Sequence, residues 1–167
     1  MNLYSNILLN FYYIVPFLIT ILLTIISITP IMPPGYESLT PLLGIISMSF
    51  WVIHRPDLMG WFFVLIIGLI SDIIYGTILG SACLSSILIR LVLSRMFLKL
   101  DVINVLYSLY YISVSLFIYI FTTSFVNMPN ISQLNYLIEP FFQYITSIIM
   151  SPIVILLQLY LLKIITR

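Results

Sequence analysis

Charged residues are scarce in this 167-residue sequence: they make up 7% of it, with six Lys and Arg against five Asp and Glu. A soluble globular chain carries about 25% charged residues, because its folded surface faces water. So few charges exclude a soluble fold and indicate lipid as the solvent. The formal net charge of +1 also offers no basic patch for nucleic acid.

Cysteine and histidine are represented by one residue each, Cys83 and His54. A single cysteine forms no intrachain disulfide and no thiolate metal cluster. The histidine has no second His, Cys or carboxylate at metal-ligand spacing and lies far in sequence from any activated serine. No Gly-rich phosphate loop is present, and Asp72 is the only carboxylate expected inside the membrane. We therefore expect no catalytic residue, no metal site and no cofactor, and hence a protein that is not an enzyme.

Apolar residues, by contrast, are abundant, at 62% of the chain. Because a helix needs roughly 20 apolar residues to cross a bilayer, the apolar runs predict an all-α integral membrane protein, a single domain with six transmembrane helices. The expected spans are residues 11–28, 39–53, 58–75, 82–98, 102–126 and 141–165 of the domain 1–167. The second span is short, so we expect it to cross with little tilt or only in part.

The positions of Lys and Arg predict the orientation of the spans, because translocated loops avoid these residues. Five of the six lie at the second connection, at the fourth connection or at the C-terminus: Arg55, Arg95, Lys99, Lys163 and Arg167. The first, third and fifth connections contain neither Lys nor Arg. With six spans all the basic positions share one side of the membrane, so we expect both termini to be cytoplasmic.

Small and polar residues recur on one face of each of the last four spans. Helices in lipid associate through small residues and interhelical hydrogen bonds, so these faces are predicted to point into the bundle. The predicted interior positions are Gly60, Val64, Gly68 and Asp72; Ala82, Ser86, Arg90 and Ser94; Asn104, Ser108, Tyr111, Ser115 and Thr122; and Gln143, Ser147, Ser151 and Gln158.

Asp72 and Arg90 are the two charges expected within the membrane, where an isolated charge is costly. One hypothesis pairs them, so that the pair locks the third and fourth spans together or lines a pocket. The other hypothesis separates them: Asp72 reaches interfacial water and Arg90 extends to the interface on its own. Gly76 and Gly80, which follow Asp72 at steps of four, fit either a tight turn or a packing face.

Residues 39–90 also carry a set of motif residues. Phe50 and Trp51 form an aromatic–Trp pair late in the second span, and Pro56 follows a few residues on. A GxxxDxxxGxxxG pattern then comprises Gly68, Asp72, Gly76 and Gly80. On these residues the sequence resembles the rod shape-determining protein MreD family.

The resemblance implies a non-enzymatic subunit of the bacterial cell-elongation machinery, located in the inner membrane and supporting rod shape and lateral peptidoglycan synthesis. Its implied partners are MreC, RodA with its class B penicillin-binding protein, and MreB. The motif residues Trp51, Pro56, Gly68, Asp72, Gly76 and Gly80 would serve packing or partner binding.

The family's membrane fold is similar to that of the substrate-binding subunits of energy-coupling-factor vitamin transporters. This similarity implies an alternative function, a small-molecule-binding subunit of a transporter. The alternative predicts a polar pocket that opens outward and a ligand that copurifies. The elongation role predicts a ligand-free pocket and partner helices bound on an outer face.

Overall fold

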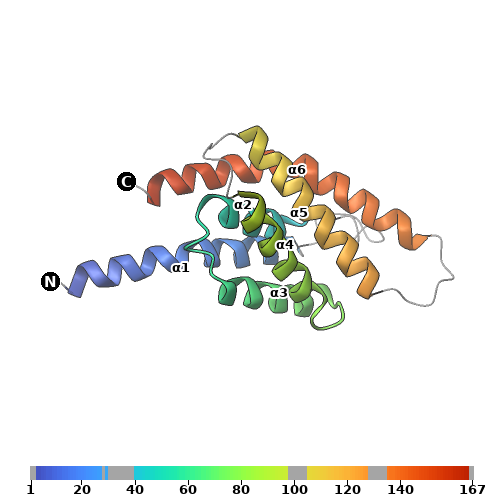
Figure 1. Cartoon of the computed structure of the whole chain (residues 1–167), viewed down its shortest axis with the longest axis horizontal. Helices are drawn as coiled ribbons and strands as arrows, with labels where there is room; N and C mark the ends of the chain where they lie inside the picture. Colours follow the sequence, from blue (N-terminus) through green and yellow to red (C-terminus); the bar gives the residue numbers. More distant parts are fainter. Residues whose placement is uncertain (1–2, 28, 30–39, 98–104, 128–134, 166–167) are drawn as a thin grey trace.

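The computed structural model describes residues 3–27, 29, 40–97, 105–127 and 135–165. Within these ranges the chain folds into six helices and contains no strand, which confirms the expected all-α class. The helices are α1 (Leu3–Ile26), α2 (Leu43–His54), α3 (Trp61–Tyr75), α4 (Ser81–Phe97), α5 (Val105–Val126) and α6 (Asn135–Ile165) (Figure 1). Each predicted span overlaps one helix.

The start of α6 differs most from its predicted boundary. The helix begins at Asn135 rather than near residue 141, and it includes Pro140 and Pro152. The segment 127–139 as a whole is polar and contains Pro129, which favours a connection, but Asn135 and Glu139 are compatible with a helix end that leaves the lipid. Pro152 lies near the middle of α6, where a proline bends a helix.

Helix α2 lies at the centre of the bundle. Every residue from Gly44 to Ile53 is buried, and α2 packs against α1, α4, α5 and α6. A helix that is apolar or small all round is expected to be surrounded by protein. Its 12 residues measure about 18 Å, which is shorter than a hydrocarbon core of about 30 Å. A helix of this length is compatible with both expectations for this segment, crossing with little tilt and crossing only in part.

Hydroxyl and amide groups join α2 to α1 and α6. Thr20 Oγ1 of α1 lies 3.0 Å from Ser47 Oγ of α2, and Gln158 Nε2 of α6 donates to the same Ser47 oxygen. At the start of α2, the backbone N–H of Leu42 donates to Ser147 Oγ of α6 at 3.0 Å. Such bonds hold helices together where apolar surface alone gains little by leaving lipid.

Most of the predicted interior positions are buried. The buried ones are Val64, Gly68, Asp72, Ala82, Ser86, Ser108, Tyr111, Ser115, Ser147, Ser151 and Gln158. Ser94 was wrongly predicted: it is exposed near the end of α4, and its hydroxyl donates to the Leu91 carbonyl of its own helix and not to another helix. Asn104 lies outside the described residues.

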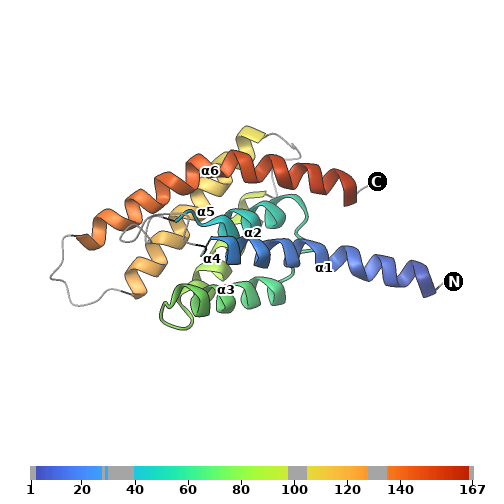
Figure 2. The ribbon, with the colours of Figure 1, turned by 180° about the vertical axis from the view of Figure 1, so that it is seen from behind.

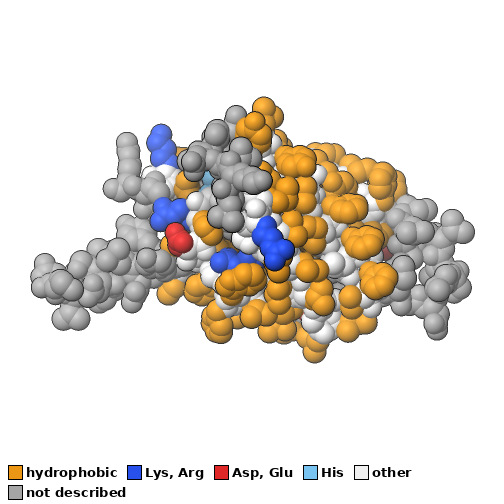
Figure 3. All heavy atoms as spheres, viewed as in Figure 1, with side chains coloured by type: hydrophobic (Ala, Val, Ile, Leu, Met, Phe, Trp, Pro, Cys, Tyr) orange, Lys and Arg blue, Asp and Glu red, His pale blue; other side chains and the backbone are white. Residues whose placement is uncertain are grey.

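Both chain ends lie at the same end of the bundle (Figure 1), and the view from behind agrees (Figure 2). The Lys and Arg side chains visible in Figure 3 lie toward this end and the centre, whereas the opposite half is covered mainly by hydrophobic side chains. The predicted orientation also used Glu37, Lys99 and Arg167, which lie outside the described residues.

In the described part of the chain, two helices are long and apolar enough to cross a membrane, Val105–Val126 and the Glu139–Ile164 part of α6. Shorter apolar stretches occupy Ile14–Ile26, Leu43–His54 and Trp61–Tyr75. Large apolar side chains are exposed on every helix except α2, for example Leu22, Phe62 and Leu84. This surface indicates association with a membrane.

Candidate functional site

The carboxylate of Asp72 organises the connection between α3 and α4. It accepts hydrogen bonds from the Thr77 hydroxyl at 2.7 Å and the Ser81 hydroxyl at 2.9 Å. The backbone N–H groups of Gly80 and Ala82 also donate to it, each at 2.8 Å. The first N–H groups of a helix have no partner within that helix and carry partial positive charge, so a carboxylate placed there stabilises the helix start. Asp72 therefore caps α4 from the last turn of α3.

Gly76 and Gly80 form the turn that brings the α4 N-terminus to this carboxylate. Gly76 ends α3 with φ of 62°, and Gly80 precedes α4 with φ of 102°. Backbone with positive φ favours glycine, because other residues place Cβ against the backbone. A Cβ at either position would meet no atom within 4 Å, so both glycines serve the turn, and the packing-face alternative fails.

Gly68 has a different role, because it brings α3 and α4 into close contact. A Cβ on Gly68 would lie 2.5 Å from Cys83 Cα and 2.6 Å from Ser86 Oγ of α4. Ser86 Oγ also donates to the Val64 carbonyl at 3.2 Å, across the same contact. The four motif residues thus supply one packing contact, one helix cap and a two-glycine turn.

The end of α5 is bonded to the same turn through Asn127, a residue that the sequence analysis did not identify as a site residue. Its Oδ1 accepts a hydrogen bond from Ile78 N–H at 2.9 Å, and its Nδ2 donates to Ser81 Oγ at 3.2 Å. An Asn at the end of a helix is a common capping residue, which was the available signal. Asn127 links α5 to the Asp72 cluster through Ser81.

Arg90 lies at the other end of α3, and the hypothesis that it pairs with Asp72 must be corrected. Its guanidinium donates to the carbonyl of Met59, and to that of Pro56 at 3.4 Å, and stands 4.9 Å from the centre of the Trp61 ring. Trp61 begins α3, whereas Asp72 lies about 16 Å further along the helix. Because α3 and α4 run antiparallel, Arg90 meets the start of α3 and not its end.

The two remaining motif residues belong to the same end of the bundle as Arg90. Trp51 is fully buried in α2 and contacts the Phe50 ring edge-on at 5.6 Å. A partner protein cannot reach it, so Trp51 serves packing. Pro56 is exposed in the connection between α2 and α3, where its carbonyl accepts the bond from Arg90.

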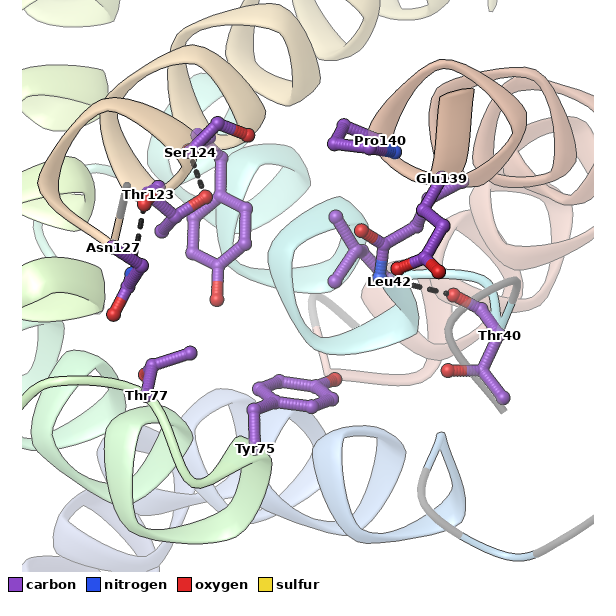
Figure 4. A pocket seen from close by; sticks show the side chains of 11 residues that line it. Thr40, Leu42, Tyr75, Thr77, Thr123, Ser124, Asn127, Glu139 and Pro140 are labelled. Atoms are coloured by element: carbon purple, nitrogen blue, oxygen red, sulfur yellow. Dashed lines mark hydrogen bonds between the residues drawn. The ribbon is translucent and has the colours of Figure 1, made fainter. Parts of the chain in front are cut away.

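A cavity of about 430 Å³ opens at the end of the bundle opposite the termini. It lies where α2 begins, where α3 and α5 end and where α6 begins. Figure 4 shows Glu139 of α6 and Tyr75 of α3 beside the same opening as Thr123 and Asn127 of α5. Small-molecule sites have volumes of about 300–1,000 Å³, so the cavity can hold a small ligand. Of the described residues that line the cavity, only Gln143 is among the interior positions predicted from the sequence. The lining residues come from four separate helix ends, so no local pattern groups them.

Comparisons with known proteins leave this region to be interpreted from its own geometry. No protein-family model, curated protein or solved structure matches the chain. Among the described residues, no group of three or more His, Cys, Asp and Glu side chains could hold a metal ion.

Proposed function

We propose that the protein is a six-span protein of the bacterial inner membrane and a non-enzymatic subunit of the cell-elongation machinery. Two helices long enough to span, further apolar helices, and chain ends on the same side of the bundle support this topology. The basic residues at the end that holds the termini support a cytoplasmic location for that end. We also propose that the fold of this protein is similar to that of the substrate-binding subunits of energy-coupling-factor transporters.

The observation that carries the functional proposal is the arrangement of Gly68, Asp72, Gly76 and Gly80, the pattern that the sequence shares with the MreD family. These residues build one rigid α3–turn–α4 unit, and the Asp72 oxygens are engaged by the chain's own donors. A carboxylate used in this way holds a surface in shape and does not act on a substrate. The proposed role is therefore that of an adaptor for partner helices.

The outer face of the α3–α4 unit is the proposed binding surface for an MreC-like helix. It carries exposed apolar side chains, Leu69 and Ile73 on α3 and Leu84 on α4. RodA, its class B penicillin-binding protein and MreB are the further partners in this proposal. A rigid helix pair with a fixed apolar face suits helix-on-helix docking in lipid, which depends on close packing.

The test uses cells of the source bacterium in which the protein is replaced by variants. Ile73, which is 71% exposed, is changed to Trp on the proposed surface, and Leu106 of α5, which is 73% exposed, is changed to Trp as the control. We expect Ile73→Trp cells to widen and to lose lateral peptidoglycan incorporation, while Leu106→Trp cells remain rods. Normal rods with both variants, at equal protein levels, would refute the proposed surface.

The cavity favours a second candidate function, a small-molecule-binding subunit of a transporter. It has the polar lining and the position, at the end opposite the termini, that this alternative predicts. Copurification separates the two functions: an elongation subunit brings MreC and RodA, whereas a transporter subunit brings a ligand and an energy-coupling partner.

A further inference from the structure

The cavity at the α2, α3, α5 and α6 ends has a distinctive chemistry. Six of the eleven described residues that line it carry a hydroxyl group, among them Tyr75, Tyr119 and Ser124, and Asn127 and Gln143 add amide groups. Among the described residues that line the cavity, Glu139 is the only charged one, and none is Lys, Arg or His. A ligand in this space therefore meets hydrogen-bonding groups and a single negative charge.

The negative charge of Glu139 has no nearby cation among the described residues. Arg55, Arg90, Arg95 and Lys163 belong to the helix ends and connections on the side of the termini. Across the length of the bundle their effect on Glu139 is screened, because this distance exceeds the screening length of about 8–10 Å in salt solution. The cavity consequently favours cations and repels anions.

Several polar groups of the lining are free to bind a ligand. Within the described part of the chain, the Glu139 carboxylate and the hydroxyls of Tyr119 and Ser124 have no hydrogen-bond partner. Tyr119 is 4% exposed and lies deep in the cavity, whereas Glu139 is exposed and marks its mouth. Other lining groups already make hydrogen bonds within the protein. Thr77 Oγ1 donates to the Asp72 carboxylate, and Gln143 Nε2 donates to the Thr40 carbonyl.

We propose that this cavity binds a small organic cation, an ammonium-bearing molecule with hydroxyl groups or an aromatic ring. The ammonium lies at the mouth against Glu139, and the remainder of the molecule enters toward Tyr119 and Ser124. One carboxylate among hydroxyls suits an ammonium group, which needs a counter-charge and several acceptors, better than it suits a divalent metal ion. A bound ligand departs from the ligand-free pocket expected for the elongation role, and it supplies the ligand class that the transporter alternative needs.

The test uses three probes of nearly equal size, and the full-length chain in nanodiscs of phosphatidylglycerol. Tyramine carries an ammonium group, tyrosol carries a hydroxyl at the same position, and 4-hydroxyphenylacetate carries a carboxylate. Binding is measured by saturation-transfer NMR at neutral pH. We expect tyramine to bind most tightly, tyrosol more weakly and 4-hydroxyphenylacetate not at all. Equal binding of the three probes, or no binding of any, would overturn the proposal.

Glu139→Gln is the decisive variant, because it removes the charge from an exposed position and keeps the shape of the side chain. It should weaken tyramine binding roughly fivefold, the effect of one partly exposed charge pair, and leave tyrosol binding unchanged. Asp57→Asn removes an equal charge from the exposed α2–α3 connection and should change neither. Unchanged tyramine selectivity in Glu139→Gln would refute the assigned role of Glu139.

The ammonium group can come from a free solute or from the headgroup of phosphatidylethanolamine. Repeating the tyramine measurement in nanodiscs that contain phosphatidylethanolamine separates these sources. Weaker tyramine binding in these nanodiscs means that the lipid headgroup competes for the cavity, and unchanged tyramine affinity means that the natural ligand is a free amine. Copurification of MreC and RodA is scored separately, with the wild-type chain. Absence of tyramine binding with retained partners overturns only the ligand site, and tyramine binding without these partners overturns only the elongation role.

Discussion

At the scale of single residues, Asp72 is the side chain on which the α3–α4 connection depends most. Its side chain is 1% exposed. Its carboxylate accepts hydrogen bonds of 2.7–2.9 Å from two hydroxyls and two backbone N–H groups. A buried carboxylate is tolerated when its hydrogen bonds are satisfied, and these four donors meet that condition. The cost of a buried charge is thus offset by the capping of α4.

Replacing Asp72 with Ala should lower the free energy of unfolding by about 2–4 kcal/mol, because it removes a helix cap and leaves buried donors without an acceptor. The measurement is unfolding of the purified protein in detergent, followed by circular dichroism. Asp57→Asn, an exposed charge change in another connection, serves as the control. A stability of Asp72→Ala equal to that of the control would contradict the capping role.

Gly76 permits a second prediction at this scale, because its φ is 62° and a Cβ there would meet no atom. The cost of substitution is therefore conformational alone. Asn adopts the left-handed region more readily than Val, so Gly76→Asn should destabilise the protein less than Gly76→Val, which should cost more than about 1 kcal/mol. Equal melting temperatures for the two variants would argue against a left-handed turn.

At the scale of helices, the contact between α3 and α4 rests on the absence of a side chain at Gly68. Gly68→Ala would place Cβ 2.5 Å from the backbone of Cys83, so the helices would have to separate. Gly60→Ala is the matched control, because no atom lies within 4 Å of a Cβ at that position. We expect a clear loss of thermal stability for Gly68→Ala and little change for Gly60→Ala, measured in the same detergent. If Gly68→Ala were as stable as Gly60→Ala, the close packing would be refuted.

The sequence predicted helices and their buried faces better than it predicted which residues meet. The stripe of Val64, Gly68 and Asp72 is buried because small residues at steps of four lie on one helix face. The pairing of Asp72 with Arg90 could not be settled from spacing, because it depends on how far α4 slides along α3. Asn127 was missed for a related reason: its partners lie in a turn 46 and 49 residues earlier in the chain.

At the scale of the whole molecule, the few charged residues lie toward both ends of the bundle: the described Lys and Arg residues lie toward the end that holds the termini (Figure 3), whereas Asp72 and Glu139 lie toward the other end. The uncharged surface suits lipid, and the basic residues mark the side that holds the termini. The cavity could not be predicted from sequence, because no local pattern specifies that the ends of α2, α3, α5 and α6 leave a space between them. Glu139 in particular lies just before the last predicted span, 141–165, where its position in the sequence gives no indication of a cavity.

The orientation predicts the accessibility of introduced cysteines. In a Cys83→Ser background, Thr29→Cys after α1 should react with a membrane-impermeant maleimide added to intact cells, because it lies at the proposed outer end and is exposed. Asp57→Cys, exposed in the connection at the other end, should react only after the cells are opened. The opposite labelling pattern would invert the topology.

Copurification tests the central claim, membership of the cell-elongation machinery, most directly. The tagged full-length protein is extracted from its own membranes in a mild detergent, and associated proteins are identified by mass spectrometry. We predict that MreC and RodA are enriched with the wild-type chain and with Leu106→Trp, and that MreC is lost with Ile73→Trp. Recovery of the wild-type protein without MreC and RodA, or with an energy-coupling transporter partner in their place, would contradict the account.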